Sequence, residues 1–251
     1  MKYFCYLGCS ILTAEVAAEI PYLDSLVDLK FVPAGFHEQP EVLKKIIQQQ
    51  IDEIEEWNEL KAKSPTSNKT YDAILLGLGL CDNATAGLHS QAIPMVIPRA
   101  HDCITLLLGS KESYREYFNK IPENYWYSSG WIKRMLQPGP ERTAELQRIY
   151  HERYGEENSH YLLQSEADWQ RKYQQATFID WELPDNQKCR EYTKECAAYL
   201  NWSYHEVKGN KRLLRDFLNG NWDEDRFLVI QPGEEIAPSF EESIVCAVKR
   251  K

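Results

Sequence analysis

The sequence lacks a long hydrophobic run and an excess of basic residues, and both absences limit what the protein binds. No apolar stretch in the 251 residues approaches the roughly 20 residues that span a bilayer. With 29 basic and 38 acidic residues the net charge is −9, which disfavours nucleic acid and anionic membrane surfaces as partners. The chain also has no stripe of basic residues interleaved with aromatic ones.

The N-terminus has no signal-peptide pattern, since one lysine precedes a short strand-like run without a small-residue cleavage site. We therefore expect a cytoplasmic protein. Seven cysteines is an odd number, which predicts free thiols rather than a disulfide framework. The apolar fraction of 43% is enough for a packed core, in one large α/β domain or two small ones.

Short apolar runs alternate with segments of helical periodicity, which is typical of an α/β fold with mainly parallel sheets. We expect two Rossmann-like lobes around a cleft: residues 1–120 with the Cys/His cluster, and residues 121–251 with an aromatic and helical connection. One continuous sheet is the alternative. Strands are predicted at 2–8, 26–32, 72–78, 93–97, 176–182, 202–207 and 226–231, helices at 10–20, 41–61, 104–119, 141–154, 165–175, 186–200 and 211–218, a loop at 64–68 and an aromatic connection at 121–131.

Three of the predicted strands end near a thiol or an imidazole. Cys9 ends the first run, Cys81 follows the third, and His101 and Cys103 follow the fourth. Ligands of parallel α/β sheets bind beyond the carboxyl ends of the strands, so these side chains should converge there. In an extended segment, residues two apart point to the same face, which would let His101 and Cys103 share one ion.

Sulfur and imidazole are the ligands that zinc prefers, and iron is the alternative metal. The sequence therefore predicts a site formed by Cys81, His101 and Cys103, with Cys9 as a fourth ligand or a nearby reactive thiol. The alternative is a set of buried thiols beside a hydrogen-bonded histidine. The remaining cysteines, which are Cys5, Cys189, Cys196 and Cys246, are expected to be structural, because free cysteine is often buried.

A glycine-rich loop, residues 77–87, follows the third run and contains Asn83 and Thr85. Such a loop lets backbone N–H groups approach an anion, although it matches neither the dinucleotide fingerprint nor the Walker pattern. A tight turn without a ligand explains it equally well. Arg99 suits carboxylate or phosphate recognition, with a surface ion pair as the alternative. Ser10 is the expected N-cap of the first helix.

Two tryptophans and a late glycine complete the candidate substrate-binding residues. Trp126 and Trp131 belong to an aromatic segment that would cap the cleft or simply pack. Gly233 follows the last predicted strand, where it either forms a turn or brings backbone to a small-molecule ligand.

Several of these segments together resemble a known family. Residues 9–15, 78–88, 97–110, 125–131 and 227–233 resemble the domain-of-unknown-function family 1638, most specifically the sequence Pro-Arg-Ala-His-Asp-Cys at 98–103. The resemblance covers nearly the whole chain and implies a protein of anaerobic bacteria or methanogens. It also implies an association with corrinoid-dependent methyl transfer, through a corrinoid or methyltransferase partner protein. The family loop usually has glycine where this chain has Asp82 and Ala84, which argues against an anion cradle there.

Three functions are compatible with these residues. The first is a zinc- or iron-dependent small-molecule enzyme that activates a thiol for methyl transfer, because His-x-Cys plus a distant Cys is similar to the zinc set of cobalamin-dependent thiol methyltransferases. The second is a non-catalytic metal, corrinoid or cofactor carrier or chaperone. The third is a metal-free cysteine racemase-like enzyme with one thiol in each of two lobes. The segment around Cys81 resembles the cysteine segment of aspartate/glutamate racemases.

Overall fold

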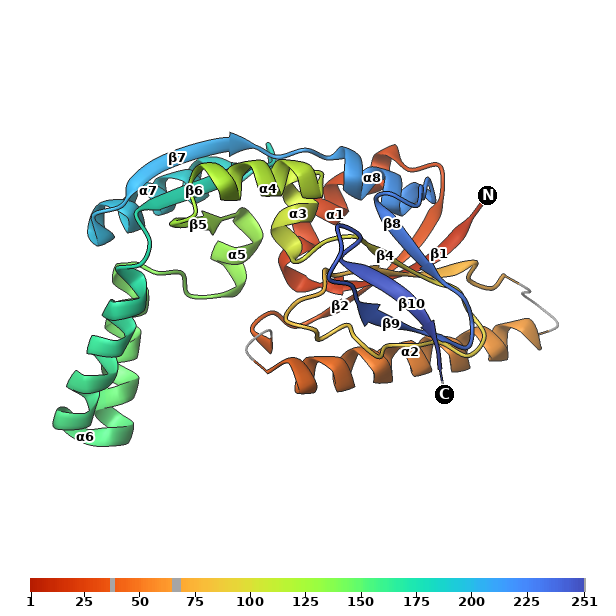
Figure 1. Cartoon of the computed structure of the whole chain (residues 1–251), viewed down its shortest axis with the longest axis horizontal. Helices are drawn as coiled ribbons and strands as arrows, with labels where there is room; N and C mark the ends of the chain where they lie inside the picture. The colour runs from red at the N-terminus through yellow and green to blue at the C-terminus, as the bar shows by residue number, and fades with distance from the viewer. Residues whose placement is uncertain (37–38, 65–68, 251) are drawn as a thin grey trace. The chain divides into compact units, whose positions relative to one another are not determined.

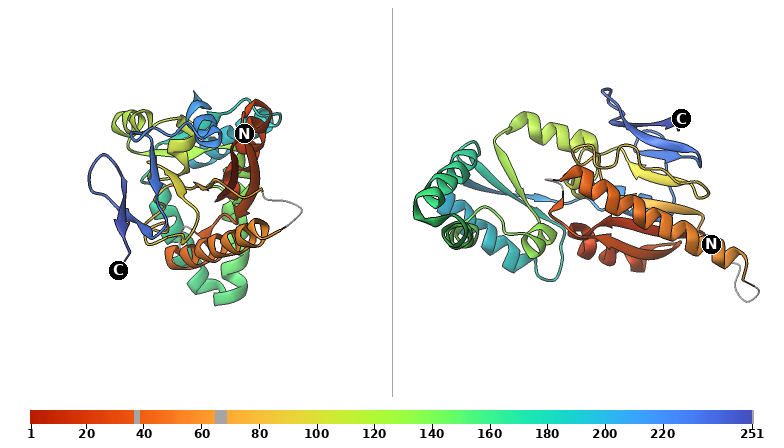
Figure 2. Two further views of the ribbon diagram at one scale, coloured as in Figure 1. Left: turned by 90° about the vertical axis from the view of Figure 1, so that its right-hand side faces the viewer. Right: turned by 90° about the horizontal axis from the view of Figure 1, so that it is seen from below.

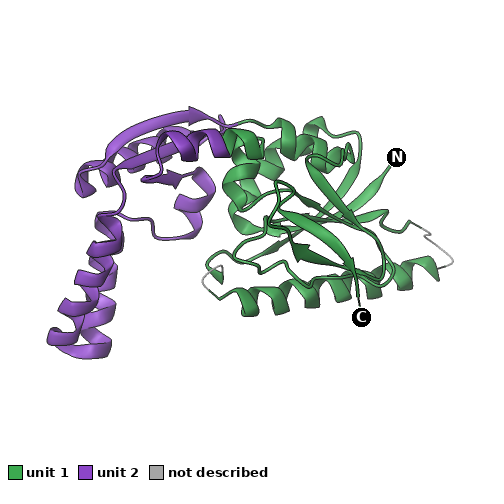
Figure 3. Ribbon diagram, viewed as in Figure 1, with its two compact units in different colours: residues 1–114, 210–251 green, residues 115–209 purple. Residues whose placement is uncertain are grey.

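The computed structural model describes residues 1–36, 39–64 and 69–250. Figure 3 shows that the chain divides into two compact units. The first unit contains residues 1–114 and 210–251, and the second contains residues 115–209. The predicted boundary at residue 120 is close, but the prediction that residues 121–251 form one lobe is wrong. Residues 210–251 return to the first unit because a strand of this segment pairs with a strand of the N-terminal half.

The first unit is built on a five-stranded sheet in the order β2-β1-β3-β4-β8 (Figure 1). Its strands are β1 (Tyr3–Cys9), β2 (Leu26–Val32), β3 (Ala73–Gly77), β4 (Met95–Pro98) and β8 (Phe227–Ile230). Strands β1 to β4 run parallel, which confirms the predicted mainly parallel α/β fold, and β8 is antiparallel to β4. The continuous apolar sequences of β3 and β4 are typical of strands buried on both faces.

Helices cover both faces of this sheet. The long helix α2 (Pro40–Ala62) buries Leu43, Ile47, Ile51 and Ile54 in a stripe that packs with Cys5 and Leu7 of β1 in one core. On the other face, Tyr6 of β1 contacts the ring of Phe217. Phe217 belongs to α8 (Arg212–Asn219), and the remaining helices of this unit are η1 (Ser10–Leu12), α1 (Thr13–Glu19), η2 (Ile20–Tyr22) and α3 (Cys103–Leu108).

Three local predictions for the first unit differ from the structure. Ser10 is not an N-cap: it lies inside η1, and its hydroxyl accepts a hydrogen bond from the N–H of Ala34 at 3.0 Å. The helix predicted at 104–119 is two helices, α3 and α4 (Lys111–Lys120), because Gly109 adopts a left-handed φ of 84°. The C-terminal hairpin of β9 (Glu234–Pro238) and β10 (Val245–Lys249) was not predicted. The loop predicted at 64–68 lies mostly outside the described residues.

The second unit has its own parallel sheet in the order β5-β6-β7. Its elements are β5 (Asn124–Tyr127), α5 (Ser129–Arg134), α6 (Pro140–Gln170), β6 (Gln175–Asp180), α7 (Asn186–Leu200) and β7 (Ser203–Lys208). Tyr127, Phe178, Cys189, Cys196 and Trp202 form its core. The aromatic connection predicted at 121–131 therefore contains a sheet strand.

Helix α6 is a hairpin of two helical arms (Figures 1 and 2). Gly155, with φ 76° and ψ 176°, reverses the chain between them. The predicted break between residues 154 and 165 is wrong, because the second arm begins directly after this glycine. At the base of the hairpin, the guanidinium of Arg142 donates to the carboxylate of Glu166 at 2.6 Å. No helix of the described ranges is long and apolar enough to cross a membrane.

We expect Glu166→Gln to make the hairpin less stable near pH 7 and less sensitive to acid. Burial raises the pKa of Glu166, but hydrogen bonds from Arg142 and Trp169 outweigh it and hold the pKa below its usual 4.5. A lowered folded-state pKa contributes stability above pH 4.5, which is lost as the pH falls through the folded pKa. The loss should be about 1 kcal/mol, measured by urea unfolding between pH 7 and pH 3.

The matched control is Glu145→Gln, which removes an exposed carboxylate paired with Arg148 on the same hairpin. This change should have little effect, because exposed ion pairs contribute little. An equal pH dependence in wild type and Glu166→Gln would contradict the expected role of the Arg142–Glu166 pair.

Candidate functional site

Two neighbouring parallel strands place a thiol each at the same edge of the first unit's sheet. Cys9 is the last residue of β1, and Cys81 lies four residues after the end of β3. The chain after β3 continues beside the chain after β4, where the N–H of Leu80 donates to the carbonyl of Ala100 and the N–H of Cys81 to that of His101, at 2.8 and 2.9 Å. The structure therefore places Cys9, Cys81 and His101 at one carboxyl edge, as the sequence predicts.

Gly79 explains why these two loops approach so closely. A Cβ at this position would lie 2.6 Å from the backbone nitrogen of Asp102 and 2.8 Å from its Cα. Side chains larger than hydrogen would push the loops apart. Gly79, which belongs to the predicted anion-binding loop, is therefore needed for the close packing of the two loops. This packing keeps Cys81 beside the segment that contains His101 and Asp102.

The loop at Cys81 has an uncommon backbone. Cys81, Asp82 and Asn83 are three consecutive residues in the left-handed region, with φ of 48°, 53° and 66°. This region is disfavoured for residues with a Cβ, and such strain is often found at functional sites. Asn83 is exposed, whereas Thr85 is fully buried and its hydroxyl donates to the carbonyl of Gly79 at 3.3 Å. Of the two predicted ligand contacts, only Asn83 is open to solvent.

His101 and Cys103 do not share an extended segment. Asp102 is the N-cap of α3, and its carboxylate accepts hydrogen bonds from the N–H groups of Ile104 and Thr105 at 3.0 and 3.3 Å. Because the helix begins at Cys103, the expected alternation of faces fails: His101 is exposed and Cys103 is buried. An Asp directly before an apolar helical run is a capping signal, and the sequence reasoning missed it.

Within residues 1–36, 39–64 and 69–250, no three His, Cys, Asp or Glu side chains form a group arranged to hold a metal ion. The residues expected to bind it were Cys9, Cys81, His101 and Cys103. The arrangement of their described side chains does not fit a ready-made zinc or iron centre. The metal site therefore stays a prediction from the sequence.

The acidic groups at this edge act on one another. Burial above all, together with negative charge on Asp102, Cys9 and Asp82, raises the pKa of Cys81 to about 12. Burial also raises the pKa of Cys9 and that of Asp102. Both thiols are therefore protonated at neutral pH, and an anion formed on Cys81 would face other potential anions.

We expect Asp102→Asn to make Cys81 more reactive. Asparagine still caps α3, but the carboxylate that raises the pKa of Cys81 is gone. The rate of Cys81 alkylation by iodoacetamide at pH 8 should rise about twofold to tenfold, the effect of up to one pKa unit. Peptide mass spectrometry measures the rate. Asp82→Asn, which removes a weaker influence on the same thiol, should have a smaller effect, and equal rates in wild type and Asp102→Asn would refute the coupling.

Arg99 and Gly233 both have structural contacts. The guanidinium of Arg99 donates to the carbonyls of Glu224, Ser243 and Val245, which secures the C-terminal segment. Because β8 runs antiparallel to β4, the turn at Gly233 lies at the opposite edge of the sheet. There the N–H of Gly233 donates to the carbonyl of Ser90 at 3.1 Å.

The two candidate tryptophans belong to the second unit. Trp126 of β5 packs edge-on against Tyr117, with ring centroids 5.7 Å apart. Trp131 lies in α5, where its backbone N–H donates to the capping hydroxyl of Ser128 at 3.3 Å. Cys189 and Cys196 are buried in the core of this unit, as expected, so the racemase arrangement with a thiol at a strand end of a second lobe is not present there.

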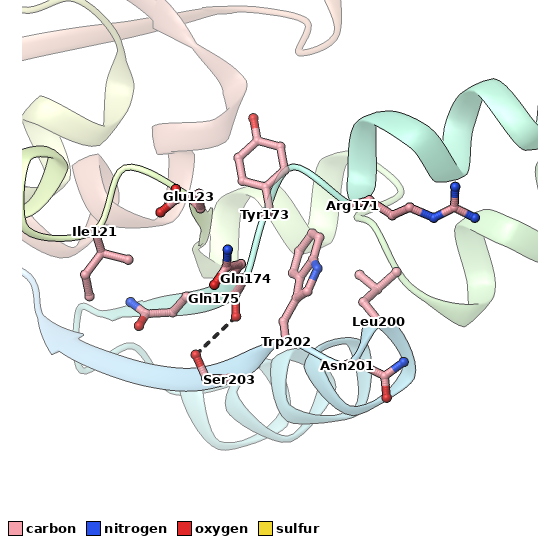
Figure 4. Close-up of a pocket in the computed structure, with 10 residues that line it drawn as sticks. All are labelled: Ile121, Glu123, Arg171, Tyr173, Gln174, Gln175, Leu200, Asn201, Trp202 and Ser203. Carbon is pink, nitrogen blue, oxygen red and sulfur yellow. Dashed lines mark hydrogen bonds between the residues drawn. The ribbon is translucent and has the colours of Figure 1, made fainter.

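The second unit also has a cavity of about 660 Å³ (Figure 4). It lies where the strands of the sheet begin, which is the edge that parallel sheets seldom use for ligands. Arg171, drawn at its rim, forms an ion pair with Asp168 at 2.6 Å, and neither Trp126 nor Trp131 lines it. The lining residues are Ile121, Glu123, Arg171, Tyr173, Gln174, Gln175, Leu200, Asn201, Trp202 and Ser203.

Comparison with known protein families gives a match over most of the chain. The model of the family described as "Protein of unknown function (DUF1638)" matches residues 31–218, which is most of the chain, so the protein belongs to this family. The matched region contains Cys81, His101 and Cys103, whereas Cys9 precedes it. No curated protein and no solved structure matches the chain.

Proposed function

We propose that this member of the DUF1638 family is a small-molecule enzyme whose reacting groups are the thiols of Cys9 and Cys81. This proposal is supported most by the position of the two thiols: the strands β1 and β3 are adjacent and parallel, and both thiols lie at their carboxyl edge. That edge is where open α/β sheets bind their ligands. The three left-handed residues that begin at Cys81 are a second sign of a functional loop.

The chemistry that we propose is nucleophilic attack by Cys81. A thiol of raised pKa is slow to ionise, but its thiolate is a stronger base and nucleophile than an ordinary one. In the reacting step, the proton of Cys81 passes to solvent, an S–C bond forms with an electrophilic carbon, and the leaving group departs with the electrons of its bond. Cys9 is the second thiol of the site.

The sequence suggests an extension of this proposal. In it, the site holds zinc or iron, and the reaction is methyl transfer with a corrinoid or methyltransferase partner protein. The described donors do not form a ready-made metal centre, so no step is derived through a metal. Elemental analysis of protein purified without oxygen tests this extension. Stoichiometric zinc or iron that is lost in both Cys9→Ser and Cys81→Ser would support it, and metal-free protein after reconstitution would remove it.

Alkylation tests whether the two thiols share one site. Treatment with excess iodoacetamide should modify Cys9 or Cys81 in a given molecule, but rarely both, because the first adduct fills the space beside the second thiol. Intact-mass and peptide analysis count the adducts. Cys246, which is partly exposed elsewhere, should react independently of either thiol. Independent modification of Cys9 and Cys81 would contradict the proposal.

A further inference from the structure

The cavity of the second unit is formed by the three loops that precede β5, β6 and β7 (Figure 4). Backbone hydrogen bonds join these loops. The N–H of Gln174 donates to the carbonyl of Glu123, and the N–H of Ser203 donates to that of Gln174, both at 2.9 Å. The chain itself therefore forms the cavity before any ligand binds. Its volume of about 660 Å³ lies within the range of roughly 300–1,000 Å³ that is typical of small-molecule pockets.

Two aromatic side chains form one wall of this cavity. Tyr173 and Trp202 both line it, and their ring centroids are 5.7 Å apart. The ring of Tyr173 also makes near-perpendicular contacts with Tyr125 and Trp169, at 5.3 and 5.9 Å. Because its neighbours already hold this ring in place, a flat apolar ligand can pack against it with little loss of side-chain entropy.

A buried glutamine supplies a hydrogen-bond acceptor to the same cavity. Gln175 lines the cavity and is only 6% exposed. Its Nε2 donates to Oδ1 of Asn124 at 3.1 Å and to Oγ1 of Thr177 at 2.9 Å, which uses both N–H groups and fixes the amide. The amide oxygen accepts no hydrogen bond from the described residues, and it is not among their fully buried atoms without a partner. It therefore has contact with the open space of the cavity, where a ligand can donate to it.

The charges around the cavity favour an uncharged ligand. Arg171 forms an ion pair with Asp168 at 2.6 Å, so this cation is already engaged. The other charged residue of the lining is Glu123, which is exposed. An anionic ligand would meet this carboxylate without a free cation from the lining. A cationic ligand would gain little, because ion pairs that are exposed to water are weak.

We propose that this cavity binds an uncharged heteroaromatic ring, whose N–H donates to the amide oxygen of Gln175 while the ring packs against Tyr173 and Trp202. Among the described residues that line the cavity, none is a cysteine or a histidine. The reacting groups of parallel α/β sheets also lie at the opposite, carboxyl edge. We therefore assign binding and no reaction to this cavity. This binding does not depend on the proposed thiol chemistry, which belongs to the first unit.

Indole and benzofuran test the proposal on the full chain. The two molecules have nearly the same shape, but indole has a ring N–H where benzofuran has an oxygen. Indole should bind at one site per chain, and benzofuran should bind about threefold to tenfold more weakly, the effect of one neutral hydrogen bond. Ligand-observed NMR titration measures both dissociation constants. Equal affinities, or no saturable binding of indole, would overturn the proposal.

Variants of the lining locate the bound ring. In Gln175→Met the two dissociation constants should become equal, because the acceptor is absent. Tyr173→Ala should weaken the binding of both molecules about threefold to tenfold, the contribution of one aromatic contact. Gln170→Met is the matched control, because Gln170 is 7% exposed and donates to Glu166 but does not line the cavity. It should retain the preference of the wild type for indole.

Urea unfolding shows whether Gln175→Met is folded; if it is not, the wild type and Tyr173→Ala decide. A preference for indole that persists in folded Gln175→Met, or that is lost equally in Gln170→Met, would overturn the proposed contact. Unchanged affinities in Tyr173→Ala would contradict the proposed cavity. Cys81→Ser should bind indole as tightly as the wild type does. Loss of binding in this variant would show that indole occupies the thiol site instead.

Discussion

Gly77→Ala should lower the free energy of unfolding of the first unit by about 3 kcal/mol, the upper range for overpacking a core. The added Cβ would overlap the phenol of Tyr6, which cannot move because Phe31 and Phe217 hold its ring. Gly8→Ala should have a similar effect for the same reason. Neither glycine has a positive φ, so the loss comes from overlap and not from backbone preference. Urea unfolding measures it.

A double-mutant cycle identifies the cause. Tyr6→Leu removes the ring and leaves space for the new methyl group. Gly77→Ala should therefore lower the free energy of unfolding much less in the Tyr6→Leu variant than in the wild type. Gly233→Ala is the control for backbone preference, because Gly233 has φ 86° and open space around it; it should cost about 1 kcal/mol. If Gly77→Ala is equally destabilising with and without Tyr6, the packing account is incorrect.

Arg215→Met should destabilise the first unit by about 3 kcal/mol. The carboxylate of Glu19 is 0% exposed, and the Nε of Arg215 lies 2.6 Å from its Oε2 atom. Removing one partner of such a pair leaves a buried charge uncompensated, which costs about 3–5 kcal/mol; the partial exposure of Arg215 favours the lower value. The pair joins α1 to α8, and therefore helps to hold the returning C-terminal segment in this unit.

Arg212→Met is the matched control, because Arg212 is on the same helix, 78% exposed, and 3.6 Å from Asp216. Its loss should have little effect on chemical unfolding. Adding Glu19→Gln to Arg215→Met should recover part of the stability, since the uncompensated charge is then absent. Equal free energies of unfolding for Arg215→Met and Arg212→Met would show that the Arg215–Glu19 ion pair does not stabilise the first unit.

Elements with a regular pattern were predictable from sequence. The strand at 26–32 and the helix at 186–200 have the predicted bounds, and the long helix α2 differs by one residue at each end. Their signals are local: apolar spacing at helical period and a proline at the first turn. The α6 hairpin was missed because a single glycine reverses the chain without an intervening loop.

The arrangement of distant segments was harder to predict. Nothing local to residues 227–230 shows that this strand pairs antiparallel with β4, and this pairing decides the unit boundaries and the position of Gly233. Cys9 and Cys81 were found because Cys9 ends one apolar strand and Cys81 follows another. The close packing of Tyr6 over Gly8 and Gly77 was missed because Tyr6 looks like an ordinary core residue, although two glycines at the ends of adjacent strands indicate that something packs closely over them.

Capture of a trivalent arsenical tests the shared thiol site most directly. Phenylarsine oxide condenses with two neighbouring thiols, forms two As–S bonds and releases water. Native mass spectrometry should show that wild-type protein binds it through Cys9 and Cys81, that Cys9→Ser and Cys81→Ser each lose this adduct, and that Cys189→Ser retains it. An adduct that persists in both Cys9→Ser and Cys81→Ser, or a wild-type protein that forms none, would contradict a site in which the two thiols act together.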